Sequence, residues 1–149
     1  MIPDLPQPVA IAPHRIHPLT KPGYVLLKVA ELDTQLEFYQ RVLGFQVKGR
    51  HQADIRLGSL GQDLVRLTQL PGGRRYRAVT GLYHFAVLFP NRRELARAIA
   101  RLLEHHWPNA PTDHVMTKTS YLEDPEGNTI ELDCESPEDG IFSVDAQGN

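Results

Sequence analysis

The sequence has little cysteine, few aromatic residues and no long apolar run. Its single cysteine, Cys134, excludes an intramolecular disulfide framework and suits a reducing compartment, so we expect a cytoplasmic protein. No apolar stretch approaches the roughly 18 to 20 residues of a membrane-spanning helix, and the first residues do not follow the pattern of a signal peptide. Positive charge is not in excess, because 16 Lys and Arg face 18 Asp and Glu. This balance argues against nucleic acid as a partner, the short apolar runs argue against a membrane, and a small molecule is favoured.

The length and composition are typical of one compact domain. The chain has 149 residues, of which 41% are apolar. A chain of this size buries about 70% of its unfolded surface, so its core needs no disulfide or structural metal. Any metal is therefore expected to be functional. Prolines crowd residues 1–22 and predict an extended arm, while the acidic residues 136–149 predict a loose tail.

The chain between these ends repeats one order of elements. Apolar and β-branched residues after a turn at Pro22-Gly23 predict a strand at Tyr24 to Val29. Asp33 or Thr34 is expected to cap a helix that ends at Gly44. Glu37 would complete a capping box with Thr34. Three short strands are then expected, and they complete a first module at residues 23–70. Their ranges are Phe45 to Arg50, Ala53 to Gly58 and Leu64 to Gln69.

A linker at residues 71–80 precedes the second module, residues 81–135. A strand is expected at Leu82 to Phe89, followed by a helix that Asn91 caps. Its buried stripe would be formed by Leu95, Ile99, Leu102 and Leu103. Further strands are expected at His114 to Lys118, Ser120 to Glu123 and Thr129 to Cys134, with a turn at residues 124–128. The pattern predicts an α+β fold: two βαβββ modules forming a cup-shaped mixed sheet with helices on its outer face.

Two side chains in the second module are candidates for chemistry. Alternation puts His84 on the same strand face as the smaller residue Ala86, opposite a bulky row formed by Tyr83, Phe85, Val87 and Phe89. In the last strand, Glu131 shares a face with Thr129 and Asp133. Each residue by itself also fits an ordinary sheet with one polar face. Aligning the two first strands places Tyr24 opposite His84.

Several segments carry a resemblance to a known superfamily. They are Gly81-Leu82-Tyr83-His84-Phe85-Ala86, Asp113-His114 and the run Tyr121 to Leu132, together with Gly23 to Asp33, Phe38-Tyr39 and Val42 to Phe45. These segments resemble the vicinal oxygen chelate superfamily, which includes glyoxalase I, bleomycin resistance proteins and extradiol dioxygenases. The resemblance extends over residues 20–137 and is nearest to the catechol-2,3-dioxygenase-like branch.

This resemblance implies a divalent metal bound in the cup. The family's ligand positions correspond to Tyr24, His84 and Glu131, with Fe(II) as the expected metal and Mn(II) or Zn(II) as alternatives. A phenol is a poor substitute for imidazole as a metal ligand, because it must first lose its proton. Three alternatives follow: Tyr24 ligates weakly, His114 replaces it, or the site has no metal and keeps a binding cavity.

The same resemblance gives roles to two further residues. His114 would be the acid/base group, and Tyr121 would hydrogen-bond the substrate oxygen. Imidazole suits proton exchange near neutral pH. The expected activity is that of an extradiol-type dioxygenase, an oxidoreductase that acts on a small catechol-like substrate with dioxygen. The alternative is a metal-free small-molecule binding protein of the bleomycin-resistance type. Related ring-cleavage proteins often carry four modules, and this chain is similar to their first two. We also expect a homodimer.

Overall fold

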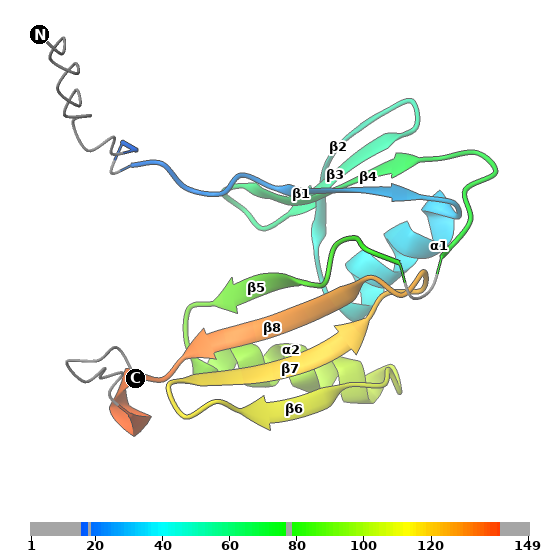
Figure 1. Cartoon of the computed structure of the whole chain (residues 1–149). Helices are drawn as coiled ribbons and strands as arrows, with labels where there is room; N and C mark the ends of the chain where they lie inside the picture. Colours follow the sequence, from blue (N-terminus) through cyan, green and yellow to red (C-terminus); the bar gives the residue numbers. More distant parts are fainter. Residues whose placement is uncertain (1–15, 18, 77–78, 141–149) are drawn as a thin grey trace, which may run out of the picture.

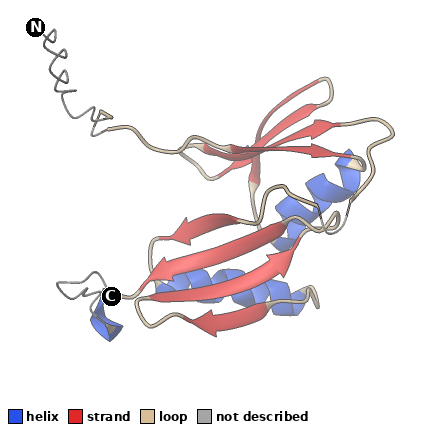
Figure 2. Ribbon diagram, in the orientation of Figure 1, coloured by secondary structure: helices blue, strands red, loops and turns tan. Residues whose placement is uncertain are grey.

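The computed structural model describes residues 16–17, 19–76 and 79–140. Two four-stranded sheets form the body of the protein, and each carries one helical segment (Figures 1 and 2). The first module has the elements β1 Val25–Val29, α1 Leu32–Glu37, a π-helical segment Phe38–Val42, β2 Gln46–His51, β3 Asp54–Gly58 and β4 Asp63–Gln69. The second has β5 Phe85–Phe89, α2 Arg92–Glu104, β6 Ala110–Asp113, β7 Thr117–Glu123 and β8 Thr129–Glu135, followed by the 3-10 turn Pro137–Asp139.

The two sheets have the same topology. The strand orders are β1-β4-β3-β2 and β5-β8-β7-β6, and the first strand of each sheet is parallel to the last. The other neighbouring strands are antiparallel. The predicted α+β fold of two βαβββ modules is therefore confirmed.

Alternation along β8 builds the core of the second module and positions its polar face. Ile130, Leu132 and Cys134 are at most 1% exposed, whereas Glu131 and Asp133 point to the opposite, partly open face. Burying an aliphatic side chain of this size contributes about 1.5 to 3 kcal/mol. The apolar row therefore determines which face Glu131 presents. In α2, Leu95 and Leu102 are buried as predicted, but Leu103 is 62% exposed and does not belong to the stripe.

The predicted cap of the first helix is wrong. The helix starts at Leu32, one residue before the expected caps, and the side chain of its N-cap residue makes no capping bond. Instead, the carboxylate of Glu126 accepts hydrogen bonds from the backbone N–H groups of Ala30 and Glu31, at 3.1 and 2.8 Å. A carboxylate from the second module thus binds the N–H of the N-cap residue Glu31 and that of the residue before it. The end at Gly44 is confirmed, with a φ of 77°.

Two predicted strands differ from the structure. β5 starts at Phe85, so His84 lies just before the strand, and Tyr83 is 86% exposed instead of packed. The strand expected at His114 to Lys118 is wrong, because residues 114–116 connect β6 to β7. The side chain of Asp113 accepts from the N–H of Val115 at 2.7 Å, and Val115 has a φ of 67°. This local hydrogen bond closes a turn at Val115. The sequence did not indicate a turn there, because β-branched residues such as valine are typical of strands.

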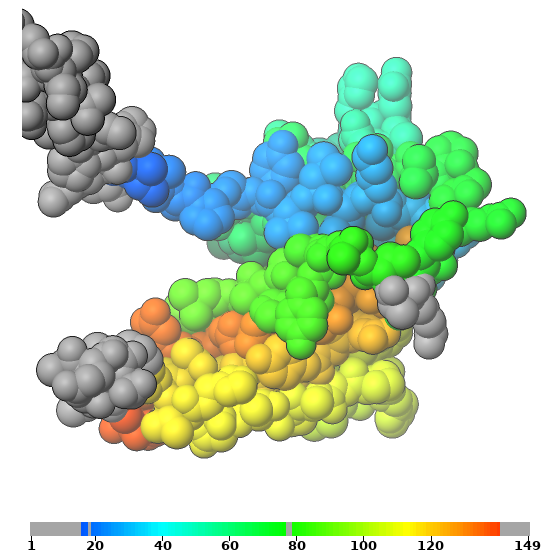
Figure 3. All heavy atoms as spheres, in the orientation of Figure 1, coloured from blue at the N-terminus to red at the C-terminus, as the bar shows by residue number. Residues whose placement is uncertain are grey.

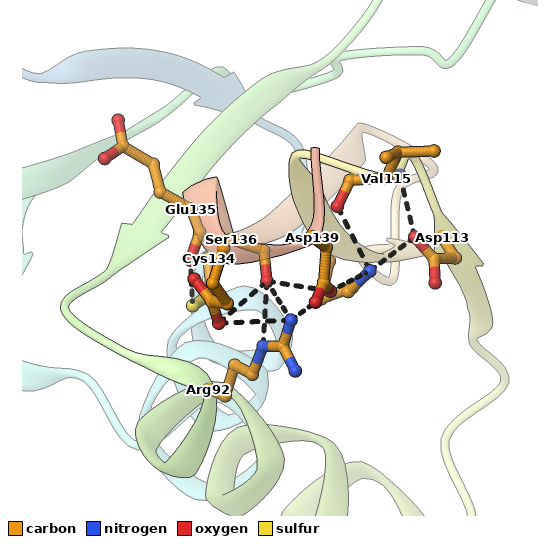
Figure 4. Close-up of polar contacts among 9 residues, drawn as sticks. Arg92, Asp113, Val115, Cys134, Glu135, Ser136 and Asp139 are labelled. Atoms are coloured by element: carbon orange, nitrogen blue, oxygen red, sulfur yellow. Dashed lines mark hydrogen bonds and ion pairs between the residues drawn. The ribbon is translucent and has the colours of Figure 1, made fainter. Parts of the chain in front are cut away.

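The described start of the predicted tail is held in place. Arg92 contacts the side chains of Ser136 and Asp139 (Figure 4). Lys118 Nζ lies 2.7 Å from Asp139. Two cations therefore fix the 3-10 turn, so residues 136–139 are not loose. The rest of the tail, from residue 141, lies outside the described residues, as do residues 1–15 of the predicted arm.

Candidate functional site

His84 and Glu131 form a direct pair at the centre of the second sheet. β8 lies between β5 and β7, and Glu131 is in register with Ala86 on one side and Tyr121 on the other. The Nε2 atom of His84 lies 3.0 Å from Oε2 of Glu131, and the Glu131 side chain is only 14% exposed. The sheet register thus brings together two residues that are 47 positions apart.

Tyr121 and His114 extend this pair. The Tyr121 hydroxyl donates to Oε1 of Glu131 at 2.6 Å. That hydrogen bond is the main reason why the pKa of Tyr121 is raised to about 12, with burial and the negative charge of Glu131 adding to it. His114 Nε2 lies 3.2 Å from the same hydroxyl oxygen. Because the phenol proton points to Glu131, the imidazole N–H is the donor in this second contact. We call the series His84, Glu131, Tyr121 and His114 the polar chain.

Asp133 is a neighbour of the polar chain to which the sequence analysis gave no role. It follows Glu131 on the same face of β8, and Thr119 Oγ1 donates to it at 2.5 Å. Partial burial raises the pKa of the Asp133 carboxyl, the hydrogen bond from Thr119 opposes that rise, and the charge of Glu131 adds to it. The alternation along the last strand was the signal that places Asp133 here.

Tyr24 does not join the polar chain. It precedes β1 in the other sheet, and the guanidinium carbon of Arg66 lies 3.8 Å from the centre of its ring. β1 and β5 run in opposite directions, so the starts of the two strands lie at opposite ends of the junction between the sheets (Figure 1). The sequence had not singled out Arg66, the stacking partner of Tyr24. Arg66 pairs with the second residue of β1, just as Glu131 pairs with the second residue of β5, so the two residues occupy equivalent positions in the two sheets.

The described residues supply an incomplete set of metal ligands. An imidazole nitrogen from His84 and a carboxylate from Glu131 are two members of the two-histidine, one-carboxylate set that holds Fe(II) in oxygenases. Within residues 16–17, 19–76 and 79–140, no three His, Cys, Asp or Glu side chains group to hold a metal. Tyr24 lies against Arg66, whose positive charge opposes a cation there. The residues therefore do not fit a complete site, and we derive no step through a metal.

A hollow of about 840 Å³ lies where the two modules meet, and it is mostly apolar. Its walls include Tyr24, Phe45, Leu64, Phe85 and Phe89. The space-filling view shows the modules meeting between the blue first strand and the green β5 (Figure 3). The polar chain is not part of this lining, so its residues are reached from the open face of the second sheet. No helix in the described part of the chain has the length and apolar character needed to cross a bilayer.

Comparison with known proteins places this fold and sequence in a family. A catechol-2,3-dioxygenase from Bacillus subtilis (strain 168) is 39% identical over 137 residues, which cover 90% of this chain and 48% of that protein. The chain thus spans about half the length of this curated relative.

Solved structures share the fold at lower identity. A lactoylglutathione lyase from Agrobacterium tumefaciens is 19% identical, with a TM-score of 0.64 over 79% of this chain and 96% of its own. A glyoxylase/bleomycin resistance protein/dioxygenase domain from Frankia sp. EAN1pec is 18% identical, with a TM-score of 0.65 over 79% and 93% of the two chains. The family model that matches residues 21–132 extends over most of the sequence. The chain therefore belongs to the glyoxalase/bleomycin resistance protein/dioxygenase superfamily.

Proposed function

We propose that the chain acts in ring cleavage of the extradiol type, on a small catechol-like substrate with dioxygen as the oxidant. The polar chain carries this proposal, because it joins two imidazoles, a carboxylate and a phenol in one hydrogen-bonded series. The identity with a catechol-2,3-dioxygenase supports it. In the balanced reaction, both atoms of dioxygen enter the product and the ring opens beside the two hydroxyls.

The residues of the polar chain have separate roles in this proposal. Tyr121 keeps its proton at neutral pH, because its pKa is about 12. It is therefore a hydrogen-bond donor that a substrate oxygen can share with Glu131. His114 is the group that exchanges a proton with the substrate hydroxyl, since its imidazole lies against the Tyr121 hydroxyl and can both donate and accept a proton. In this proposal His84 and Glu131 would hold the metal, as two ligands of a set that the described residues leave incomplete.

A second candidate function is binding of a small aromatic molecule without metal. One observation favours it: Tyr24, at the position of the third ligand, is stacked against the Arg66 guanidinium. A protein of this kind would bind its ligand with equal affinity in the presence and absence of a chelator.

Metal titration separates the two candidates. Fe(II), Mn(II) and Zn(II) are titrated into the full chain without air, with calorimetry as the readout. His84→Ala removes one proposed ligand, and His105→Ala, an exposed imidazole at the end of α2, is the matched control. The first candidate predicts one site that His84→Ala abolishes and His105→Ala retains, followed by oxygen uptake with a catechol. A wild type that binds no metal, but whose melting temperature a catechol raises equally with chelator, supports the second.

A further inference from the structure

The open face of the first sheet contains a second hollow, of about 370 Å³, with a basic lining. The guanidinium groups of Arg50, Arg56 and Arg66 contribute to its walls from β2, β3 and β4. Arg56 and Arg66 are directly opposite each other in the antiparallel pair β3-β4. Like charges at directly opposite positions destabilise a sheet, so this pair is not explained by stability of the sheet alone.

The two guanidinium groups that lie opposite each other share a single carboxylate. Arg56 and Arg66 are both paired with one oxygen, Oδ2 of Asp63, at 3.6 and 3.1 Å. Arg50 lies 3.8 Å from Asp33, whose side chain is 91% exposed, and pairs of this kind are weak. Asp54, the carboxylate in the lining, accepts a hydrogen bond from the Thr68 hydroxyl at 2.5 Å. Arg56 and Arg66 therefore share one carboxylate, Asp63, and this pair of guanidinium groups has one positive charge in excess.

The arginine pair is held in a defined geometry. Arg66 donates to Asp63 Oδ2 from both Nε and Nη2, at 3.3 and 3.1 Å, and the ring of Tyr24 packs against its guanidinium plane. Arg56 lies over Gly49, where an added Cβ would come within 3.2 Å of its Nε. Asp63 takes the Nε–Nη2 edge of Arg66, so a ligand carboxylate would bind through the Nη1–Nη2 edge. Because the guanidinium plane is already fixed, little side-chain freedom is lost on binding.

The equivalent place in the second sheet has the opposite charge. Arg66 is in register with Leu26 and Arg56, just as Glu131 is in register with Ala86 and Tyr121. The repeated topology therefore presents an arginine pair on one open face where the other face presents the Glu131–Tyr121 pair. The open face of the first sheet, with its two arginines, is suited to bind an anion. The open face of the second sheet, with Glu131, is suited to bind a cation or a hydroxyl group.

We propose that the open face of the first sheet is a binding site for an organic carboxylate, whose charged group lies between Arg56 and Arg66. The apolar part of the ligand would cover Leu26, which lines the hollow and is 50% exposed. This site uses none of the residues of the polar chain. It therefore does not depend on the ring-cleavage proposal.

The test is calorimetric titration of the full chain with benzoate, with inorganic phosphate as the competing class of anion. Wild type is expected to bind benzoate saturably, and Arg66→Met to weaken that binding about tenfold or more, since a charge-assisted hydrogen bond is lost. Arg93→Met removes an equal charge from an exposed position on α2 and should bind as wild type does. Asp63→Asn should bind more tightly, because it removes the carboxylate that competes for both arginines. Added salt should weaken binding.

Thermal unfolding and circular dichroism check that each variant is folded. If Arg66→Met does not fold, Arg56→Met carries the test, because it leaves the Arg66–Asp63 pair in place. His84→Ala should bind benzoate with wild-type affinity, which separates this site from the polar chain. Absence of saturable benzoate binding by the wild type, or equal binding of benzoate by Arg66→Met and the control Arg93→Met, would overturn the proposal. Tighter binding of phosphate than of benzoate would overturn the assignment to carboxylates.

Discussion

At the scale of single residues, the direction of one proton organises the polar chain. The Tyr121 hydroxyl has one proton, and it points to Glu131 at 2.6 Å. The hydroxyl oxygen is left as the acceptor for His114 Nε2 at 3.2 Å. Glu131 receives Tyr121 on one oxygen and His84 on the other. The Glu131 carboxylate therefore links His84 to Tyr121. A change at Glu131 is expected to alter the pKa of the Tyr121 hydroxyl directly.

Replacement of Glu131 by glutamine should lower the pKa of Tyr121. The hydrogen bond to the carboxylate is the largest cause of the rise to about 12, so its loss returns the phenol toward its reference value of about 10. The measurement is a spectroscopic titration of tyrosinate, with the curve of Tyr121→Phe subtracted to isolate this residue. An unchanged titration in Glu131→Gln would contradict the geometry of the polar chain.

The same shift has a consequence for stability at high pH. The folded protein holds the phenol proton more tightly than the unfolded chain, so this contribution is fully present below about pH 10. It is lost as the pH rises from about 10 to about 12. The stability of the wild type relative to Tyr121→Phe should decline over that window.

At the scale of elements, the turn between β7 and β8 joins the two modules. Asp124 accepts hydrogen bonds from the backbone of Glu126 and Asn128, which fixes the turn, and Gly127 has a φ of 78°. The buried hydroxyl of Tyr39 donates to Asp124 at 3.3 Å. Burial is the first cause of the raised pKa of Tyr39, and the charge of Asp124 is the second. The turn of the second module thus supplies the carboxylates, Asp124 and Glu126, that bind the helical segment of the first module.

Replacement of Glu126 by alanine should destabilise the protein by about 1 kcal/mol, the usual cost of losing a helix cap. The reason is that its carboxylate accepts from the backbone at Ala30 and Glu31, just before α1. Thr34→Ala is the matched control, because Thr34 lies inside the helix and is not its cap. Denaturant unfolding at constant pH measures both changes. An equal loss of stability in Thr34→Ala would contradict this prediction and would support the capping box of Thr34 and Glu37 that the sequence suggests.

At the scale of the whole molecule, the modules share one hydrophobic core. Buried residues from both sheets form one cluster, which includes Leu67 of the first module and Leu102 of the second. Trp107 of the second module packs against Phe38 of the first, with ring centres 4.7 Å apart. Its indole N–H donates to the backbone of Glu123 at 2.9 Å. The single tryptophan therefore reports on the contact between the modules.

Unfolding should occur in one cooperative step. In a denaturant titration, fluorescence of Trp107 and far-UV circular dichroism should give coincident transitions. Leu67→Ala, in the first module, should cost about 2 to 5 kcal/mol and shift both transitions equally, although Trp107 belongs to the second module. A midpoint of Trp107 fluorescence that does not respond to Leu67→Ala would show that the modules unfold separately.

Local patterns were sufficient for most of the secondary structure. Apolar patterns and turn residues located most of the strands but not β6. Asn91 caps α2 through the N–H of Glu94 at 3.1 Å, as predicted. The patterns failed where a side chain distant in sequence replaced a local one, as Glu126 does at α1. They also failed where a polar side chain closed a turn among β-branched residues, as Asp113 does before Val115.

The sequence by itself determined the two βαβββ modules, because apolar periodicity and turn residues act over short distances along the chain. It also pointed to His84, Glu131, His114 and Tyr121, through their resemblance to a family. Only the tertiary structure decided that these four residues form one hydrogen-bonded series and that Tyr24 instead lies against Arg66. The register between strands makes these contacts, and register depends on the packing of a whole sheet.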